Sequence, residues 1–379
     1  MCGLLPGILA GCTANGAWDD IAGVLKPTAD EDPPPEEDPP LWARRMAITV
    51  DGTQSNEMLF GFPVMVRVPA GTIEEDLVND DKDNFGFFDG AWSEGLEPLE
   101  HTLASSGPDE DYVFWVKLAT IQPGSETTTL YLYYGGTETV EPAGSAVWNN
   151  GYTVVMHFEE RSVEDGYIDS SPFANHSVPS AGHTEPETVA GFAGQAADFV
   201  EATDALIIPN SPSIETMQPF TFSMLVNYRA FRSVSRLLAK GDYYVQMTVN
   251  GGNLRHQFRL QFDTVDTVLD RNDALDTDVW RYMTIMWNGT DTTNSVELRR
   301  DLSLLANAGG AWGSGIRDDD STKDLGIGNQ QDLGGNRAID GLIDELRISR
   351  VARSLTWLTT EYRSYTGDLV ALGAVETLE

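Results

Sequence analysis

Cysteine is almost missing from this chain of 379 residues, which contains only Cys2 and Cys12. Both lie close to the start, so the rest of the chain cannot form a disulfide bond within itself. Thiolate metal sites and thiol nucleophiles are excluded from that part for the same reason. The stability and chemistry of the main body must therefore come from other side chains.

Basic residues are also scarce, with 24 Lys and Arg against 59 Asp and Glu, which gives a formal charge of −35. Such a balance argues against a nucleic-acid partner and against direct adsorption to anionic lipid. It fits a soluble surface protein, a saline habitat or the binding of divalent cations. No run reaches the about 18 apolar residues of a membrane-spanning helix, so we expect membrane attachment, if any, only through a lipid anchor.

The first twelve residues, 1–12, resemble the export signal of bacterial lipoproteins. A short apolar run, 4–10, ends in Leu9-Ala10-Gly11-Cys12, which is similar to a lipobox. The resemblance implies removal of the signal, lipidation of Cys12 and an extracytoplasmic location at the outer membrane or cell surface. No Lys or Arg precedes Leu4. The alternatives are a start further upstream or a frayed N-terminus with two chance cysteines.

Residues 13–40 read as an acidic, proline-rich linker. Every residue from Asp30 to Pro40 is acidic or proline. Proline favours the extended polyproline II conformation, and the carboxylates repel one another. The stretch 30–40 has no apolar residue to pack, so it is typical of a spacer between an anchor and a folded body. A disordered tail without a role is the alternative.

Beyond Pro40 the pattern predicts an all-β protein of two β-sandwich domains, 41–150 and 151–379. Short alternating runs are separated by Gly, Asp, Asn and Pro turns, and the boundary falls near Asn149-Asn150-Gly151. Predicted strands in the first part are 45–50, 62–68, 112–118 and 127–134. In the second part they are 153–158, 205–208, 220–228, 236–239, 243–249, 256–262, 281–287, 295–300, 325–328 and 341–349. One or two helical turns are expected from Ser354.

The second part, about 152–377, resembles the concanavalin A-like jelly roll of the laminin-G-like type. Five pieces carry this resemblance in the family's order: Met156-His157-Phe158 with Asp169-Ser170-Ser171, Gly194 to Phe199, Phe220 to Val226, Trp280 to Thr284, and Gly341 to Arg350. The resemblance implies the fold. It does not fix a function, because this fold includes lectins, adhesion modules, glycosidase appendages and inert spacers.

The first part, about 41–148, resembles a bacterial surface domain of unknown function, number 2341. The matching pieces are Trp42 with Arg44 and Arg45, Asp83 to Phe88, Leu99-Glu100-His101, Trp115-Val116-Lys117 and Tyr131 to Gly136. The family usually has Asn where this chain has Gly136. The resemblance implies a β-sandwich in an extracytoplasmic setting, often followed by a jelly roll of the type described above. It implies no activity.

Familiar catalytic arrangements are missing from the sequence. Glycosidases on the jelly-roll fold place two carboxylates on one strand face, whereas Asp344 and Glu345 are adjacent, as are Glu159 and Glu160. Serine-hydrolase, zinc-protease and phosphate-loop motifs are also missing. We therefore expect a binding protein and not an enzyme. Its partner would be a glycan or an extracellular protein. The alternatives are a structural surface or fibre component and a glycosidase-associated protein with an unrecognised catalytic site.

Asp344 is the most unusual carboxylate of the second part. Strand alternation puts it with Leu342, Leu346 and Ile348, and burying it unpaired would be costly if that face is the core. The family often binds calcium near the sheet edge, which makes calcium the expected cofactor, with Asp344 and Asp169 as ligands. The alternative is that Asp344 accepts backbone N–H groups and holds a loop in place.

Three aromatic residues are candidates for contact with a sugar ring. Trp312 lies in a glycine-rich segment, 309–315, where it would either stack on a ligand or cap the end of the sandwich. Tyr243 and Tyr244 follow Gly241-Asp242 and are weaker candidates of the same kind. The sequence itself identifies neither the ligand nor the role of the first domain.

Overall fold

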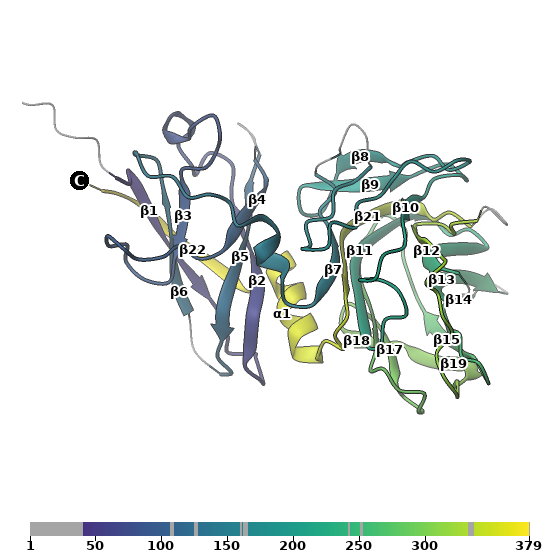
Figure 1. Cartoon of the computed structure of the whole chain (residues 1–379). Helices are drawn as coiled ribbons and strands as arrows, with labels where there is room; N and C mark the ends of the chain where they lie inside the picture. The colour runs from purple at the N-terminus through teal and green to yellow at the C-terminus, as the bar shows by residue number, and fades with distance from the viewer. Residues whose placement is uncertain are drawn as a thin grey trace, which may run out of the picture. The chain divides into compact units, whose positions relative to one another are not determined.

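Short antiparallel strands are the main regular structure of the described residues (Figure 1). The structure is a computed structural model that describes residues 41–378 except 107–109, 125–127, 160, 162–165, 242, 251–252 and 333–336. The predicted signal 1–12, its Cys12 and the linker 13–40 lie outside the described residues. The strand content confirms the all-β prediction, and Pro40–Glu379 form one unit.

The first sandwich combines a four-stranded and a three-stranded sheet. The four-stranded sheet has the order β22 (Val370–Thr377), β1 (Arg44–Val50), β6 (Thr128–Tyr134) and β3 (Phe85–Phe88). The three-stranded sheet has the order β2 (Leu59–Val68), β5 (Tyr112–Ile121) and β4 (His101–Ser105). Short 3₁₀ helices, η1 (Glu75–Leu77) and η2 (Gly144–Trp148), lie in the connections.

The last strand of the chain belongs to this first sandwich. Strand β22 pairs with β1 in antiparallel register, with Met46 opposite Val375. Its partner β1 buries Met46, Ile48 and Val50 completely, as the alternation of apolar residues predicts. The division at residue 150 stays a prediction, but residues 370–377 do not lie in a sheet of the jelly roll.

The jelly roll consists of two larger sheets. One has the order β10 (Leu206–Ile208), β20 (Leu325–Ile327), β12 (Val234–Lys240), β13 (Tyr243–Asn250), β14 (Asn253–Leu260), β15 (Thr267–Asp273) and β19 (Ala306–Ala311). The other has the order β18 (Ser303–Leu304), β17 (Val296–Arg300), β16 (Trp280–Trp287), β11 (Phe220–Ala230), β21 (Asp340–Ser349), β9 (Gln195–Phe199) and β8 (Glu187–Ala190), and β7 (Tyr152–Met156) also pairs with β21.

The outer faces of these two sheets differ. Strand β11 is buried on both faces: Phe222 and Val226 enter the core between the sheets, whereas Leu225 joins a second core. That second core also contains residues of the first sandwich and of helix α1 (Leu355–Thr366). The β13–β15 strands instead alternate, with Tyr244, Gln257 and Arg259 half-buried on the outer face. The seven-stranded sheet, which contains β13–β15, therefore has a polar outer face.

Helix α1 begins and ends where the sequence supplies caps. Ser354 accepts a hydrogen bond from the Trp357 backbone N–H at 3.1 Å, and Gly367 ends the helix in the left-handed conformation with φ of 78°. Trp357, Leu358 and Tyr365 then lie buried in the second core. The helix is longer than the one or two turns that the sequence suggested.

A buried charge cluster, formed by His157, Glu345, Arg347 and Glu361, lies in the same region. Arg347 pairs with Glu345 at 3.0 Å and with Glu361 at 3.2 Å, and all three side chains are at most 2% exposed. The guanidinium carbon lies 4.2 Å from the Trp115 ring centroid. The cluster thus joins strand β21, helix α1 and strand β5 of the first sandwich.

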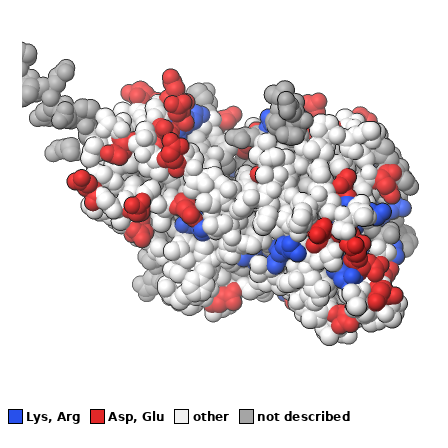
Figure 2. Space-filling view, viewed as in Figure 1, with Lys and Arg blue, Asp and Glu red and all other residues white. Residues whose placement is uncertain are grey.

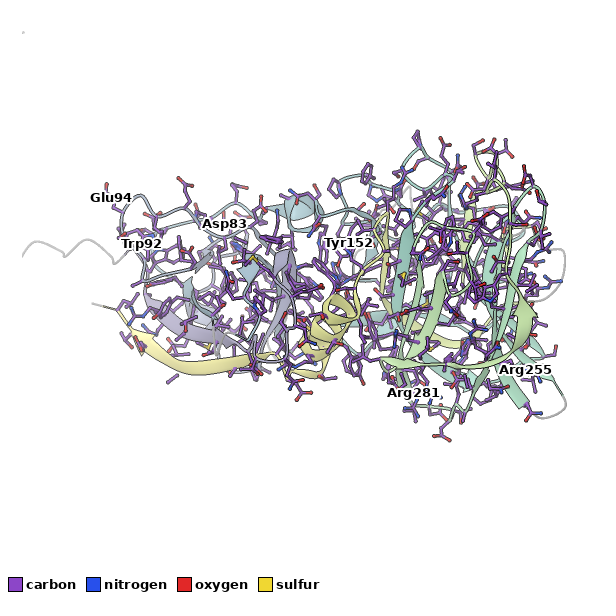
Figure 3. The ribbon with its side chains drawn as sticks, turned by 90° about the horizontal axis from the view of Figure 1, so that it is seen from below. Asp83, Trp92, Glu94, Tyr152, Arg255 and Arg281 are labelled. Atoms are coloured by element: carbon purple, nitrogen blue, oxygen red, sulfur yellow. The ribbon has the colours of Figure 1, made fainter. Side chains whose placement is uncertain are left out.

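Hydroxyl groups surround the Glu361 carboxylate in this cluster. Tyr282 donates to it at 2.6 Å and Ser223 at 2.7 Å, while Tyr152 lies 3.3 Å away. Tyr152 is labelled near helix α1 in Figure 3 and also accepts from the Trp357 indole at 3.2 Å. The buried carboxylate is therefore compensated by hydrogen bonds as well as by Arg347.

Acidic side chains outnumber basic ones on the face that Figure 2 shows. Several of the arginines are paired, for example Arg44 with Glu74 at 2.6 Å. No helix within the described residues is long and apolar enough to cross a membrane.

Candidate functional site

Asp344 is fully buried and is held by backbone N–H groups. Its Oδ2 accepts from Phe192 at 2.8 Å and Ala193 at 2.9 Å, and its Oδ1 accepts from Glu345 at 2.7 Å. Burial and the neighbouring Glu345 charge raise the pKa of Asp344 well above its usual value, although the three hydrogen bonds act in the opposite direction. These contacts support the alternative of a carboxylate that holds a loop.

The side chain of Asp344 does not lie on the face that simple alternation predicts. Ile343, Leu346 and Ile348 enter the jelly-roll core, whereas Asp344 is paired with Leu225, which faces the second core. The register shifts between Ser223 and Leu225, and Glu345 has a φ of 49°. This β-bulge resets the alternation within β21, so the predicted grouping of Leu342 and Asp344 with Leu346 is wrong.

Asp169, the second predicted calcium ligand, is likewise occupied. Its Oδ1 accepts from the Val155 N–H at 2.7 Å and the Ser171 N–H at 2.8 Å, and its Oδ2 accepts from the Asn175 N–H at 2.7 Å. Burial raises its pKa, and the bonds from Ser171, Val155 and Asn175 oppose that rise. Asp169 thus organises its own loop, and Asp344 organises another at 192–193.

Calcium binding stays a prediction of the sequence. Among the described residues, no group of three or more His, Cys, Asp and Glu side chains is arranged to hold a metal ion. Calcium also accepts backbone carbonyls and hydroxyls as ligands, which that criterion does not count.

Two of the three aromatic candidates pack on the core between the jelly-roll sheets. Tyr243 is 3% exposed and belongs to that core, and Trp312 is half-buried and packs against it. Trp312 therefore has the contacts of a residue that caps the end of the sandwich. Ligand binding by either residue stays untested.

Tyr244, the third candidate, lies on the polar outer face of the seven-stranded sheet. The Arg236 guanidinium carbon lies 3.6 Å from the centroid of its ring. Its hydroxyl donates to Gln257 Oε1 at 2.9 Å. One face of the tyrosine ring is therefore occupied, and a ligand would stack on the other.

A row of four polar side chains, the sheet-face row, crosses strands β12–β15 beside Tyr244. Its members are Arg236, Gln246, Gln257 and Asp270, and each lies opposite the next in the antiparallel register of the sheet. Gln257 Oε1 accepts from Gln246 Nε2 at 2.9 Å, and Gln257 Nε2 donates to Asp270 Oδ1 at 2.9 Å. Each amide is thereby fixed in one orientation.

The row continues to a glycine in the next strand, Gly309, which pairs with Asp270. A Cβ atom added to Gly309 would meet nothing within 4 Å, so the space above this position is open. Gln246 Oε1 is buried and has no hydrogen-bond partner in the described part of the chain. The row contains amide, carboxylate and guanidinium groups, which can bond to both donors and acceptors of a polar ligand. Gln257 and Asp270 are half-buried, whereas Arg236 and Gln246 are buried.

The site residues predicted from the sequence include the adjacent Tyr244 but no member of this row. The signal that was available is the polar residue at every second position in β13 and β14, where Tyr244, Gln246, Gln257 and Arg259 alternate with core residues. Alternation shows that these residues share a face. It does not show that the face stays uncovered.

A separate pocket of about 360 Å³ lies beside the Asp169 loop and strand β4. Its lining includes His157, Glu159 and Asp169. Glu159 accepts from the Gln195 N–H at 2.9 Å, and Asp169 is 3% exposed. Both carboxylates are thus engaged with backbone groups, which gives no support to the acid and nucleophile roles that glycoside hydrolysis needs.

Residues 200–358 match a family model described as the concanavalin A-like lectin/glucanases superfamily. This match supports the jelly-roll resemblance for less than half of the chain. The matched segment contains the whole sheet-face row. Among curated proteins, none matches the sequence significantly.

Solved structures with similar folds include sugar-binding proteins. Domain 4 of an extracellular arabinanase from Geobacillus stearothermophilus, solved with arabinotriose, has 15% identity and a TM-score of 0.40 over 55% of this chain and 96% of its own. A sialidase carbohydrate-binding module from Ruminococcus gnavus, bound to α2,3-sialyllactose, has 13% identity and a TM-score of 0.32, covering 47% and 96%. A pentraxin from Limulus polyphemus has 15% identity and a TM-score of 0.30, with the same coverages of 47% and 96%.

Proposed function

We propose that this protein is an exported surface protein that recognises carbohydrate through the outer face of its seven-stranded sheet. The sheet-face row beside Tyr244 is the observation that supports this proposal. Sugars bind through many hydroxyl groups, each a donor and an acceptor, and rigid amides and carboxylates match them. In this proposal the protein binds the carbohydrate and does not catalyse a reaction on it. A glycan is preferred over a protein partner because the row is polar and lacks a large apolar anchor.

A glycan array probed with the full chain tests this proposal. We expect binding to a single class of glycan, and Gln257→Leu should weaken it about tenfold because it removes the group that orders the row. Thr248→Val, on the same sheet face but outside the row, serves as the matched control and should leave the affinity unchanged. Absence of binding to any glycan would favour the structural or fibre role with protein partners.

The export part of the proposal depends on Cys12. We expect the full chain, expressed in a bacterium that processes lipoproteins, to partition into detergent. Cys12→Ala should shift it to the aqueous phase, because the substitution removes the residue that carries the proposed lipid. The measurement is phase separation followed by immunodetection. Equal membrane association of the variant and the parent would contradict the lipid anchor.

A further inference from the structure

A small hollow at the β12–β13 turn, the Lys240 pocket, contains two buried cations and one buried carboxylate. It has a volume of about 50 Å³, and Lys240, Tyr243, Arg317 and Asp320 are among its lining residues. The Lys240 side chain is fully buried, that of Arg317 is 3% exposed and that of Asp320 is 9% exposed.

Both carboxylate oxygens of Asp320 accept hydrogen bonds from neighbouring groups. Its Oδ1 accepts from Lys240 Nζ at 2.6 Å and from the Thr216 N–H at 2.8 Å, and its Oδ2 accepts from Arg317 Nη2. One carboxylate is therefore bonded to two cations, while Glu215 and Asp319 interact with Lys240 only through longer-range attraction. A buried cation that shares its carboxylate is unfavourable unless a further acceptor compensates it.

Donors without acceptors line the same hollow. Arg317 Nε and Nη1 and the Tyr243 hydroxyl are buried, and none of them has a hydrogen-bond partner in the described part of the chain. The Arg317 guanidinium carbon lies 5.4 Å from the Tyr243 ring centroid, so the two residues are neighbours. Burial raises the pKa of Tyr243, which keeps its hydroxyl protonated and able to donate.

We propose that the Lys240 pocket binds a small oxyanion, a carboxylate or sulfate group, either carried by an acidic sugar or free in solution. A volume of about 50 Å³ admits such a group but not a sugar ring, so the ring of an acidic sugar would stay outside. The acidic-sugar source rests on the proposed carbohydrate recognition. Asp318 and Asp319 also line the pocket and oppose an anion, so we expect weak, millimolar affinity.

Isothermal titration of the full chain at constant ionic strength tests the proposal with three probes: sodium glucuronate, sodium sulfate and glucose. Glucuronate and sulfate should bind and compete with each other, and glucose should not bind at this pocket. Tyr243→Phe should weaken both anions threefold to tenfold because it deletes one donor. Tyr228→Phe is the matched control, since the Tyr228 hydroxyl is also buried and has no hydrogen-bond partner among the described residues.

The outcomes separate this inference from the proposed function. Sulfate binding without glucuronate binding, weakened in Tyr243→Phe, supports the oxyanion pocket and assigns it to a free anion. Glycan-array binding that neither anion nor Tyr243→Phe alters leaves the proposed function standing and overturns the pocket. No heat with either anion, or equal affinity in Tyr243→Phe and the parent, also overturns it.

Discussion

Arg347→Met should lower the free energy of unfolding by about 3–5 kcal/mol, because two buried carboxylates, Glu345 and Glu361, lose the cation that they share. Burial lowers the pKa of Arg347, but Tyr365, Glu361 and Glu345 raise it well above its usual value, so the side chain stays charged. Methionine keeps much of the apolar volume between the aromatic rings. The loss is therefore mainly electrostatic and should appear as a lower urea midpoint.

Arg229→Met is the matched control for this substitution. Arg229 also pairs with two carboxylates, including Asp340 at 2.9 Å, but its side chain is 42% exposed. Exposed ion pairs contribute about 0–1 kcal/mol. A loss below about 1 kcal/mol for Arg347→Met, equal to that of Arg229→Met, would show that the buried charge cluster is not a major source of stability.

Strand β5 could be predicted from its apolar sequence, but its contact with the buried charge cluster could not. The run from Tyr112 to Leu118 has few polar residues, which predicts a strand buried on both faces. Phe114 and Val116 pack in the first sandwich, and the Trp115 ring contacts Arg347. More than 200 positions separate Trp115 from Arg347 in the sequence, and no local pattern encodes that contact.

Local patterns worked best where a repeat or a cap fixes the structure. Alternation located strands such as β13, and Ser354 marked the start of helix α1. They failed where tertiary contacts decide, as in the pairing of β22 with β1 and in the bulge at Glu345. A left-handed backbone at a glutamate is rare, so the change of face that it causes could not be expected from the sequence pattern.

The candidate site was only partly predictable for a related reason. Tyr243 and Tyr244 are identical and adjacent, and alternation states only that they face opposite sides of the sheet. The side that is covered depends on which sheet carries helix α1 and the first sandwich. In this protein they cover the eight-stranded sheet, so Tyr244 is left on the outer face while Tyr243 lies in the core.

The neighbours Asp344 and Glu345 should affect stability in opposite directions as the pH changes. Burial alone would raise the pKa of Glu345, but His157 at 2.9 Å and Arg347 overcome it, so the pKa lies below its usual value. A carboxyl group with a lowered pKa stabilises the fold above its unfolded-state pKa of about 4.3, and this contribution is lost on acidification. The raised pKa of Asp344 gives the reverse dependence.

Glu345→Gln should therefore lower the free energy of unfolding by several kcal/mol at pH 7, about as much as Arg347→Met does. The loss should become progressively smaller as the pH falls below about 4.3. Asp344→Asn should lower the free energy of unfolding most near pH 4, and the loss should become smaller as the pH rises. The reason is that the parent is itself destabilised at higher pH, where the buried carboxyl group of Asp344 would have to ionise. Urea unfolding of the parent and both variants from about pH 3 to pH 8 measures the two differences. If the losses for the two variants change with pH in parallel, the adjacent carboxylates do not have opposite roles. A lowered pKa at Glu345 and a raised pKa at Asp344 require the two losses to change in opposite directions.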